Sequence, residues 1–184
     1  KIFLIKLQEN GRSYSAIHSI RGVLRPAFQM AFEDEEIGYN PFNFELAKVL
    51  INDSVQREAL KPREQRLFLN FVKEDRHFSK YYDGISILFK TGLRISEFCG
   101  LTVHDINFDE HTFSVNNQLQ RTREGEYIIV PTKTSAGKRV LPMTKEVEEH
   151  FRNIIKEREK PRIEPMIDGK SGFLYLDKNG NPSV

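Results

Sequence analysis

The spacing of the apolar residues changes along this 184-residue chain, and these changes restrict the possible folds most strongly. Over residues 13–35, apolar side chains recur at steps of three and four, which is typical of an amphipathic helix. Between about 112 and 142 they occur in short β-branched or aromatic runs separated by turn residues. Helical spacing returns over 144–159. This order excludes a βαβ array and a sandwich, and predicts a mainly α chain with a small antiparallel sheet (α+β).

Residues 1–52 are predicted to form a small all-helical domain. Its longest helix, 13–35, can be capped by Ser13 or Ser15. Pro26 predicts a kink rather than an end, because the apolar pattern continues past it. Shorter helices are expected at 1–10 and 45–52. The inward face of the long helix comprises Ile17, Ile20, Leu24, Ala27 and Ala31.

A polar stretch without helical spacing, residues 53–61, follows this domain and is interpreted as a linker. The second domain then covers residues 62–184. Pro62 suits the first position of a new helix, since proline lacks an N–H that the first turn could not use. The inward residues of that helix are expected to be Leu67, Phe71 and Val72.

Two more helices are predicted before the sheet, at about 79–90 and from Arg94 to Gly100. Gly92 provides the stop between them. The runs "HTFSVNN", "EYIIVPT" and "KRVLPM" predict one three-stranded antiparallel sheet. Thr144 can cap the last helix. That helix places four residues on one face: Val147, Phe151, Ile154 and Arg158.

The composition excludes several classes of protein. No run of about 18 apolar residues occurs, so we expect no transmembrane helix. The short apolar start lacks a cleavage site and resembles a helix entered partway, which predicts a fragment rather than a signal peptide. The single Cys99 cannot form an internal disulfide, which suits a reducing cytoplasm. With a net charge of only +2, a nucleic-acid site requires a local basic face.

No glycine-rich phosphate loop and no zinc-type spacing of cysteine and histidine is present, so we expect no nucleotide cofactor and no metal. The segment "KTGLRISEFCGL" instead places Arg94 at the start of a helix, where the partial positive charge disfavours a cation. One interpretation is a simple Arg94–Glu97 pair one turn apart. The other is an anion site, in which helix N–H groups and the guanidinium bind phosphate oxygens while Glu97 orients Arg94.

Two further sets of basic residues are candidates for function. Lys133 lies in a predicted hairpin, where a lysine usually protects a sheet edge but can also donate a proton or contact phosphate. Lys138 and Arg139 add cations beyond that turn. His18, Arg21 and Arg25 are predicted to share one face of the 13–35 helix, either as a solvated face or as contacts to DNA phosphates.

The block "TGLRISEFCGLTVHDINFDEHTFSV", followed by "TKTSAGKRVLPM", closely resembles the tyrosine recombinases, the phage integrase family. It looks closest to integrases of conjugative transposons from Gram-positive bacteria. The resemblance implies a cytoplasmic bacterial recombinase that integrates and excises a mobile element. It implies a helical core-binding domain and a mixed catalytic domain that clamp opposite faces of double-stranded DNA. It also implies a tetrameric synapse, and it leaves an excisionase open as a partner.

The resemblance assigns a role to three residues. Arg94 matches the first catalytic arginine, which binds the scissile phosphate, and Glu97 matches the acidic residue that supports it. Lys133 matches the hairpin lysine, which protonates the leaving 5′-hydroxyl. In such enzymes a tyrosine attacks the phosphate and forms a 3′-phosphotyrosyl link, with no metal and no energy-rich cofactor.

The His-x-x-Arg box and the nucleophilic tyrosine of the family are not found after Lys133. His18 and Arg21 have the spacing of the box but precede Arg94, and His150 is followed by asparagine where arginine is needed. Tyr175 is interpreted as a strand residue. We therefore predict that this segment alone does not cleave DNA. The alternatives are a non-catalytic DNA-binding relative, or a helical protein-interaction domain.

Overall fold

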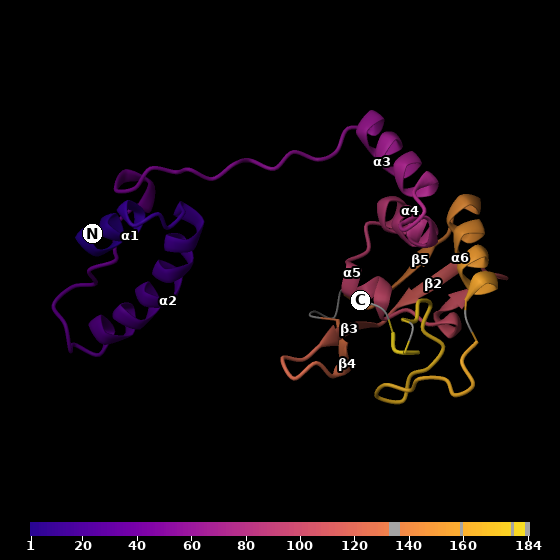
Figure 1. The fold of residues 1–184 in the computed structure, drawn as a ribbon. Coiled ribbons are helices and arrows are strands. Elements are labelled where there is room, and N and C mark those ends of the chain that lie inside the picture. Colours follow the sequence, from indigo (N-terminus) through magenta and orange to yellow (C-terminus); the bar gives the residue numbers. More distant parts are fainter. Residues whose placement is uncertain (133–136, 159, 178, 183–184) are drawn as a thin grey trace. The chain divides into compact units, whose positions relative to one another are not determined.

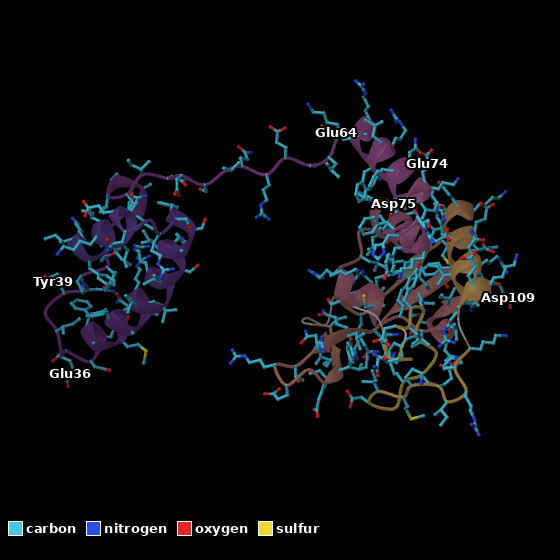
Figure 2. All side chains as sticks on the ribbon, in the orientation of Figure 1. Glu36, Tyr39, Glu64, Glu74, Asp75 and Asp109 are labelled. Carbon is cyan, nitrogen blue, oxygen red and sulfur yellow. The ribbon has the colours of Figure 1, made fainter. Side chains whose placement is uncertain are left out.

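The computed structural model describes residues 1–132, 137–158, 160–177 and 179–182, and it divides the chain into two compact units (Figure 1). The first unit is Lys1–Ala59 and the second is Leu60–Val184. The division falls inside the predicted linker. Residues 51–61 form no helix or strand until Pro62, and their side chains are exposed along an extended segment (Figure 2).

The first unit consists of helix α1 (Ile2–Glu9), helix α2 (Tyr14–Glu33) and a short 3-10 turn, η1 (Leu46–Lys48). The hydroxyl of Ser13 caps α2 by accepting a hydrogen bond from the Ala16 N–H at 3.3 Å. Pro26 lies inside α2, which continues past it as predicted. The helix expected over 45–52 is only the single turn of η1.

The core of the first unit is small and lies at the N-terminal half of α2. Its buried residues are Leu4, Ile17, Leu46 and Leu50. Of the predicted inward face of α2, only Ile17 is fully buried, and Ala27 is exposed. The linker begins close to this core, because the Asp53 carboxylate accepts a hydrogen bond from the Tyr14 N–H at 2.8 Å.

The described part of the second unit contains helical segments both before and after its strands. They are α3 (Pro62–Glu74), the 3-10 turn η2 (Ser79–Tyr81), α4 (Tyr82–Thr91), α5 (Ile95–Cys99) and α6 (Lys145–Glu157), with a further 3-10 turn, η3 (Val103–Asp105), between α5 and the first strand. Pro62 is the first residue of α3, as predicted. Gly92 ends α4 with φ of 66°, the left-handed conformation that glycine adopts without strain.

The predicted inward face of α3 is wrong at two of its three positions. Val72 is 2% exposed, but Leu67 and Phe71 are 59% and 57% exposed. The least exposed residues of α3 are Gln65, Leu69 and Val72, which are spaced by four and three residues. The helix packs on α4, where the rings of Phe68 and Phe89 have centroids 5.8 Å apart. Leu67 and Phe71 lie on a neighbouring face.

The strands form two separate antiparallel sheets. One has the order β1 (Ile106–Asn107), β2 (Thr112–Val115), β5 (Arg139–Pro142), and the other is a hairpin of β3 (Asn117–Arg121) and β4 (Tyr127–Pro131). The fold class is confirmed, but the prediction of one sheet from three runs is wrong. Val115 pairs with Arg139 and Asn117 pairs with Pro131, so the chain leaves the first sheet and enters the second at Asn116.

The core of the second unit lies between the three-stranded sheet and helices α4 to α6. The rings of Phe113 on β2 and Phe151 on α6 are both fully buried, with centroids 5.3 Å apart. Thr144 caps α6, as predicted, by accepting a hydrogen bond from the Val147 N–H at 3.3 Å. This core fixes α5 and the start of β5, which carry the candidate site. Among the described residues, no helix combines the length and apolar character needed to cross a lipid bilayer.

Candidate functional site

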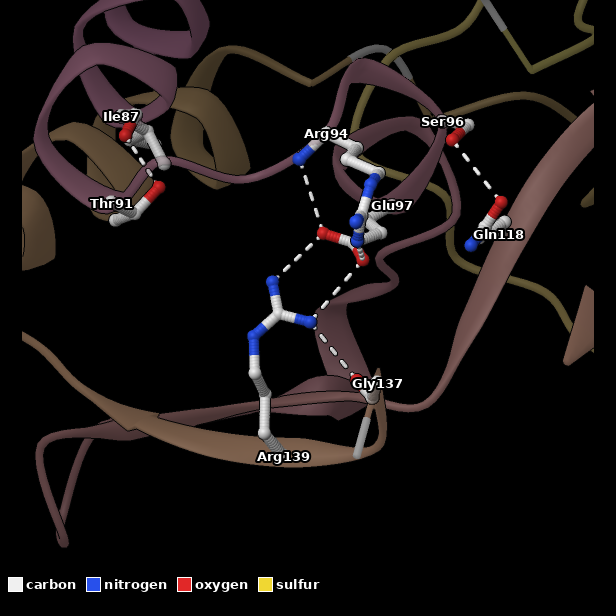
Figure 3. Close-up of polar contacts among 8 residues, drawn as sticks. All are labelled: Ile87, Thr91, Arg94, Ser96, Glu97, Gln118, Gly137 and Arg139. Atoms are coloured by element: carbon white, nitrogen blue, oxygen red, sulfur yellow. Dashed lines mark hydrogen bonds and ion pairs between the residues drawn. The ribbon is translucent and has the colours of Figure 1, made fainter. Parts of the chain in front are cut away.

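A fully buried carboxylate, Glu97, is the centre of a cluster of charged residues in the second unit. Glu97 lies in α5 and is 0% exposed. One of its oxygens accepts a hydrogen bond from the Arg94 backbone N–H at 3.0 Å, and the other accepts one from Arg94 Nη1 at 2.9 Å (Figure 3). The Arg94–Glu97 pair predicted from the sequence is therefore present, and Glu97 also caps the start of its own helix.

The same carboxylate is bound by a second arginine, Arg139, from the start of β5. Arg139 Nη2 donates to one Glu97 oxygen at 2.8 Å and Nη1 donates to the other at 3.2 Å (Figure 3). The hydrogen bonds from Arg139, followed by those from Arg94, lower the pKa of Glu97 to about 2. The hydrogen bond to Glu97 raises the pKa of Arg139. Glu97 is therefore an anion at neutral pH.

Arg94 and Arg139 differ in their exposure to solvent. The Arg94 side chain is 72% exposed and the Arg139 side chain is 29% exposed. Among described residues, only Nη1 of the Arg94 guanidinium has a hydrogen-bond partner. Two guanidinium groups against one carboxylate leave a formal charge of +1 on the cluster. Arg94 thus presents unused N–H groups and a net positive charge to solvent.

The start of α5, where the sequence predicts an anion site, contains an anion of the chain itself. Helix α5 has five residues, too few to build the large dipole of a long helix. The Arg94 N–H at its start is already used by Glu97. The anion at the start of the helix is therefore Glu97, and the exposed guanidinium of Arg94 lies beside it.

The structure separates the two cations predicted beyond the hairpin turn. Lys138 is exposed, as a DNA contact requires. Arg139 turns inward to Glu97 and also donates to the Gly137 carbonyl at 2.9 Å. Sequence reasoning missed this role, because Arg139 and Glu97 are 42 positions apart. Lys133 lies outside the described residues.

The predicted basic face of α2 is also only partly present. His18 and Arg25 are exposed, but Arg21 is half-buried. Arg21 Nη2 donates to the carbonyl of Phe42 at 3.0 Å and to that of Phe44, and its guanidinium stacks on the Phe44 ring at 5.3 Å. Arg21 therefore holds the 42–44 loop against α2, which a residue on a face opposite the apolar stripe could not do.

A shallow basic cavity of about 450 Å³ lies beside this loop in the first unit. Its lining residues are Arg21, Arg25, Asn43, Phe44, Glu45 and Lys48. Lys48 is a cation that the sequence analysis did not single out. Its place beside Arg25 depends on the turn at η1, which no sequence periodicity indicates.

Tyr175 has the surroundings of a structural residue. Its hydroxyl accepts a hydrogen bond from the Gly84 N–H in the first turn of α4 at 3.2 Å. Its ring packs against Phe98 and Tyr81, each with centroids 6.0 Å apart. Burial raises the pKa of the Tyr175 phenol well above its ordinary value. These contacts disfavour the phenolate that a nucleophile requires.

His150 likewise has a partner within the fold. Its Nδ1 lies 2.6 Å from the Asp83 carboxylate, so the pair joins α6 to α4. Among the described residues, no cluster of three potential metal ligands is found.

Several known proteins resemble this chain in sequence. The phage integrase family matches residues 58–183. The transposase from transposon Tn916 of Enterococcus faecalis is 39% identical over 185 residues, which cover 100% of this chain and 45% of that protein. The tyrosine recombinase XerA of Pyrococcus furiosus is 27% identical over 167 residues, which cover 77% of this chain and 54% of that protein. The chain spans about half the length of the curated relatives it matches.

Solved structures show the same relationship. The integrase of transposon Tn1549, in complex with transposon right end DNA, matches with a TM-score of 0.90 and 40% identity, covering 99% of this chain and 57% of that chain. A lambda integrase tetramer bound to a Holliday junction matches with a TM-score of 0.57 and 17% identity, covering 98% and 46% of the two chains. The second likeness shows a shared fold only.

Proposed function

The chain belongs to the phage integrase family, and on this basis we propose that it is the DNA-binding and phosphate-activating part of a site-specific tyrosine recombinase. The transposon relatives support integration and excision of a mobile element as its task. The substrate is double-stranded DNA at recombination sites. The protein would act in the bacterial cytoplasm. Four copies would assemble in the recombination synapse, and an excisionase is a candidate for a further partner.

The exposed guanidinium of Arg94, supported by buried Glu97, is the observation that carries this proposal. A planar guanidinium matches two phosphate oxygens, and a net charge of +1 on the cluster attracts the phosphodiester. Charge spreads over the non-bridging oxygens of the phosphate in the transition state, where a fixed cation lowers the barrier. Arg94 is therefore assigned to the scissile phosphate, and Glu97 to the support of Arg94.

The reaction needs two further groups. Tyrosine oxygen attacks phosphorus, the bond to the 5′-oxygen breaks, and a 3′-phosphotyrosyl link forms. Lys133 is assigned to protonate the leaving 5′-oxygen, and no residue of this chain is assigned as the nucleophile. Religation reverses these steps and conserves the bond energy. His18, Arg25, Lys138 and Lys48 are assigned to phosphates along the duplex, where they position the DNA without reading its sequence.

Covalent trapping on a nicked DNA substrate tests this function in the complete open reading frame that encodes the chain. The complete protein should form a covalent DNA–protein adduct, and Arg94→Ala and Lys133→Ala should each abolish it. The 184-residue chain alone should form no adduct. If adducts persist in both variants, the assignment of the site is wrong.

The alternative, a non-catalytic DNA-binding relative, predicts a different result in the same experiment. Duplex DNA would bind with a strong dependence on salt, because phosphate contacts release counterions. The complete protein would nevertheless form no adduct. A helical protein-interaction domain predicts neither adducts nor salt-dependent DNA binding.

A further inference from the structure

The guanidinium of Arg139 is turned to Glu97 and to the Gly137 carbonyl, and its side chain is 29% exposed. We propose that Arg139 is a positioning residue, which holds Glu97 so that Arg94 keeps both its orientation and a net positive charge for phosphate. This inference rests on the proposed function of the Arg94 site.

The first argument is the balance of charge. An isolated Arg94–Glu97 pair would be formally neutral and would attract a phosphodiester weakly. With Arg139 the carboxylate is shared between two guanidinium groups, and the cluster retains +1. Glu97 and most of Arg139 are buried, whereas the Arg94 side chain is 72% exposed. The positive charge of the cluster therefore faces solvent at Arg94.

The second argument is geometry. Arg139 contacts both oxygens of Glu97, at 2.8 and 3.2 Å, which fixes the plane of the carboxylate. That plane in turn sets the position of the oxygen that accepts from Arg94 Nη1 at 2.9 Å. A lysine at position 139 would keep the charge but lacks the planar fork.

The third argument is the rigidity of the support behind Arg139. Its Nη1 also donates to the Gly137 carbonyl at 2.9 Å. Gly137 is packed so closely that a Cβ there would lie 2.5 Å from Thr132 Cβ. The Gly137 carbonyl therefore has little room to move next to the start of β5. The Arg139 guanidinium is bound both by this carbonyl and by Glu97.

The experiment compares four substitutions in two assays. Arg139→Gln removes both charge and fork, and Arg139→Lys retains only charge. The double variant Glu97→Gln with Arg139→Gln restores the formal charge of +1, and Lys156→Gln is the matched control for loss of an exposed cation in the same unit. Affinity for a duplex is measured with the 184-residue chain, and the single-turnover cleavage rate with the complete open reading frame.

If Arg139 acts as proposed, the affinity for DNA should depend on the net charge of the cluster. The cleavage rate should depend in addition on the orientation of Glu97 and Arg94. Arg139→Gln should weaken both by tenfold or more. Arg139→Lys and the double variant should bind DNA within about twofold of the wild type but cleave at least tenfold more slowly. A cleavage rate within twofold of the wild type in Arg139→Gln overturns the proposal.

A third measurement separates this inference from the proposed function. The charged groups that face Glu97 among described residues are Arg94 and Arg139. In the 184-residue chain, the 13C signal of the Glu97 carboxyl should titrate near pH 2. In Arg139→Gln it should titrate at a clearly higher pH, because the largest of the contacts that lower the pKa is lost. The amide spectrum checks that this variant is folded, and Arg139→Lys replaces it if it is not. If the Glu97 titration is the same in Arg139→Gln and in the wild type, the positioning role of Arg139 is wrong. If the complete protein forms no covalent adduct, only the proposed recombinase function is wrong.

Discussion

At the scale of single residues, the arrangement around Glu97 explains how a charged side chain is tolerated at 0% exposure. A buried carboxylate is costly unless hydrogen bonds and opposite charges replace its hydration. Here the Arg94 N–H and two guanidinium groups supply both. The same contacts make Glu97 a strong contributor to stability only while it is ionised.

The stability of the second unit should consequently depend on the ionisation of Glu97. Its pKa in the folded state, about 2, lies below the ordinary value of 4.5, so its contribution is complete above pH 4.5 and is lost as the pH falls toward 2. This linkage is on the order of 3 kcal/mol. Urea unfolding at pH 6 and pH 3 should show a large deficit of Glu97→Gln at pH 6 and a smaller one at pH 3. Equal deficits at the two pH values would contradict this account.

Tyr175 offers a second test at the residue scale. Its hydroxyl satisfies the Gly84 N–H, one of the donors that the first turn of α4 cannot satisfy internally. Tyr175→Phe should therefore lower the free energy of unfolding by about 1–2 kcal/mol. Tyr39→Phe, at a residue that is 73% exposed on the first unit (Figure 2), is the matched control. In the complete open reading frame Tyr175→Phe should still form the covalent adduct, and loss of the adduct would make Tyr175 the nucleophile.

At the scale of elements, the residues at helix ends predicted where several helices begin and end. The pairing of the strands and the packing of α3 depend on residues far away in the sequence, and the predictions failed there. Ser13, Pro62, Gly92 and Thr144 act within one turn of their own positions, so their roles follow from the neighbouring residues. The partner of the strand at "EYIIVPT" depends on where a distant strand lies, and the three-stranded prediction failed there. The inward face of α3 failed for the same reason, because its packing partner was not known.

The contacts of the candidate site also differ in whether they join residues that are near or distant in the sequence. Arg94 and Glu97 are three positions apart, so their contact could be predicted from helical spacing. The contact between Glu97 and Arg139 joins α5 to β5 across 42 positions. No periodicity carries that information, and Arg139 was predicted only as a further cation beyond the hairpin turn.

The packing of α5 on β3 gives a prediction at the element scale. Gly100, at the end of α5, lies so close to β3 that an added Cβ would be 2.9 Å from the Leu119 backbone nitrogen. Since backbone atoms cannot rotate away, Gly100→Ala should destabilise the second unit by about 2–3 kcal/mol. Hydrogen exchange resolved by residue would show faster exchange throughout that unit.

The control for this change is Gly22→Ala in the first unit. Gly22 lies inside α2, and a Cβ added there would have no heavy atom within 4 Å, so alanine meets open space. Alanine also favours the helix over glycine, and we expect about 0.5–1 kcal/mol of stabilisation. If both substitutions changed stability equally, close packing at Gly100 would not be the cause.

At the scale of the whole molecule, two units with separate cores are joined by a chain segment whose side chains are exposed. Each unit offers basic residues, such as Arg25 in the first and Arg94 in the second. Two weak sites on one chain bind a duplex more tightly than either alone, because binding of one raises the effective concentration of the other. The linker over 53–61 spans at most about 30 Å when fully extended, and this length sets an upper limit on the distance between its two ends.

Cutting the linker should therefore weaken DNA binding without unfolding either unit. A protease site placed at residues 55–58 leaves the Tyr14–Asp53 hydrogen bond and the start of α3 intact. After cleavage, affinity for a duplex should fall by roughly 100-fold, and the dependence of affinity on salt should become shallower, since each fragment contacts fewer phosphates. The uncut variant controls for the inserted sequence, and circular dichroism checks that both fragments stay folded. Unchanged affinity after complete cleavage would place the whole binding free energy in one unit, and the separate fragments would then identify which one.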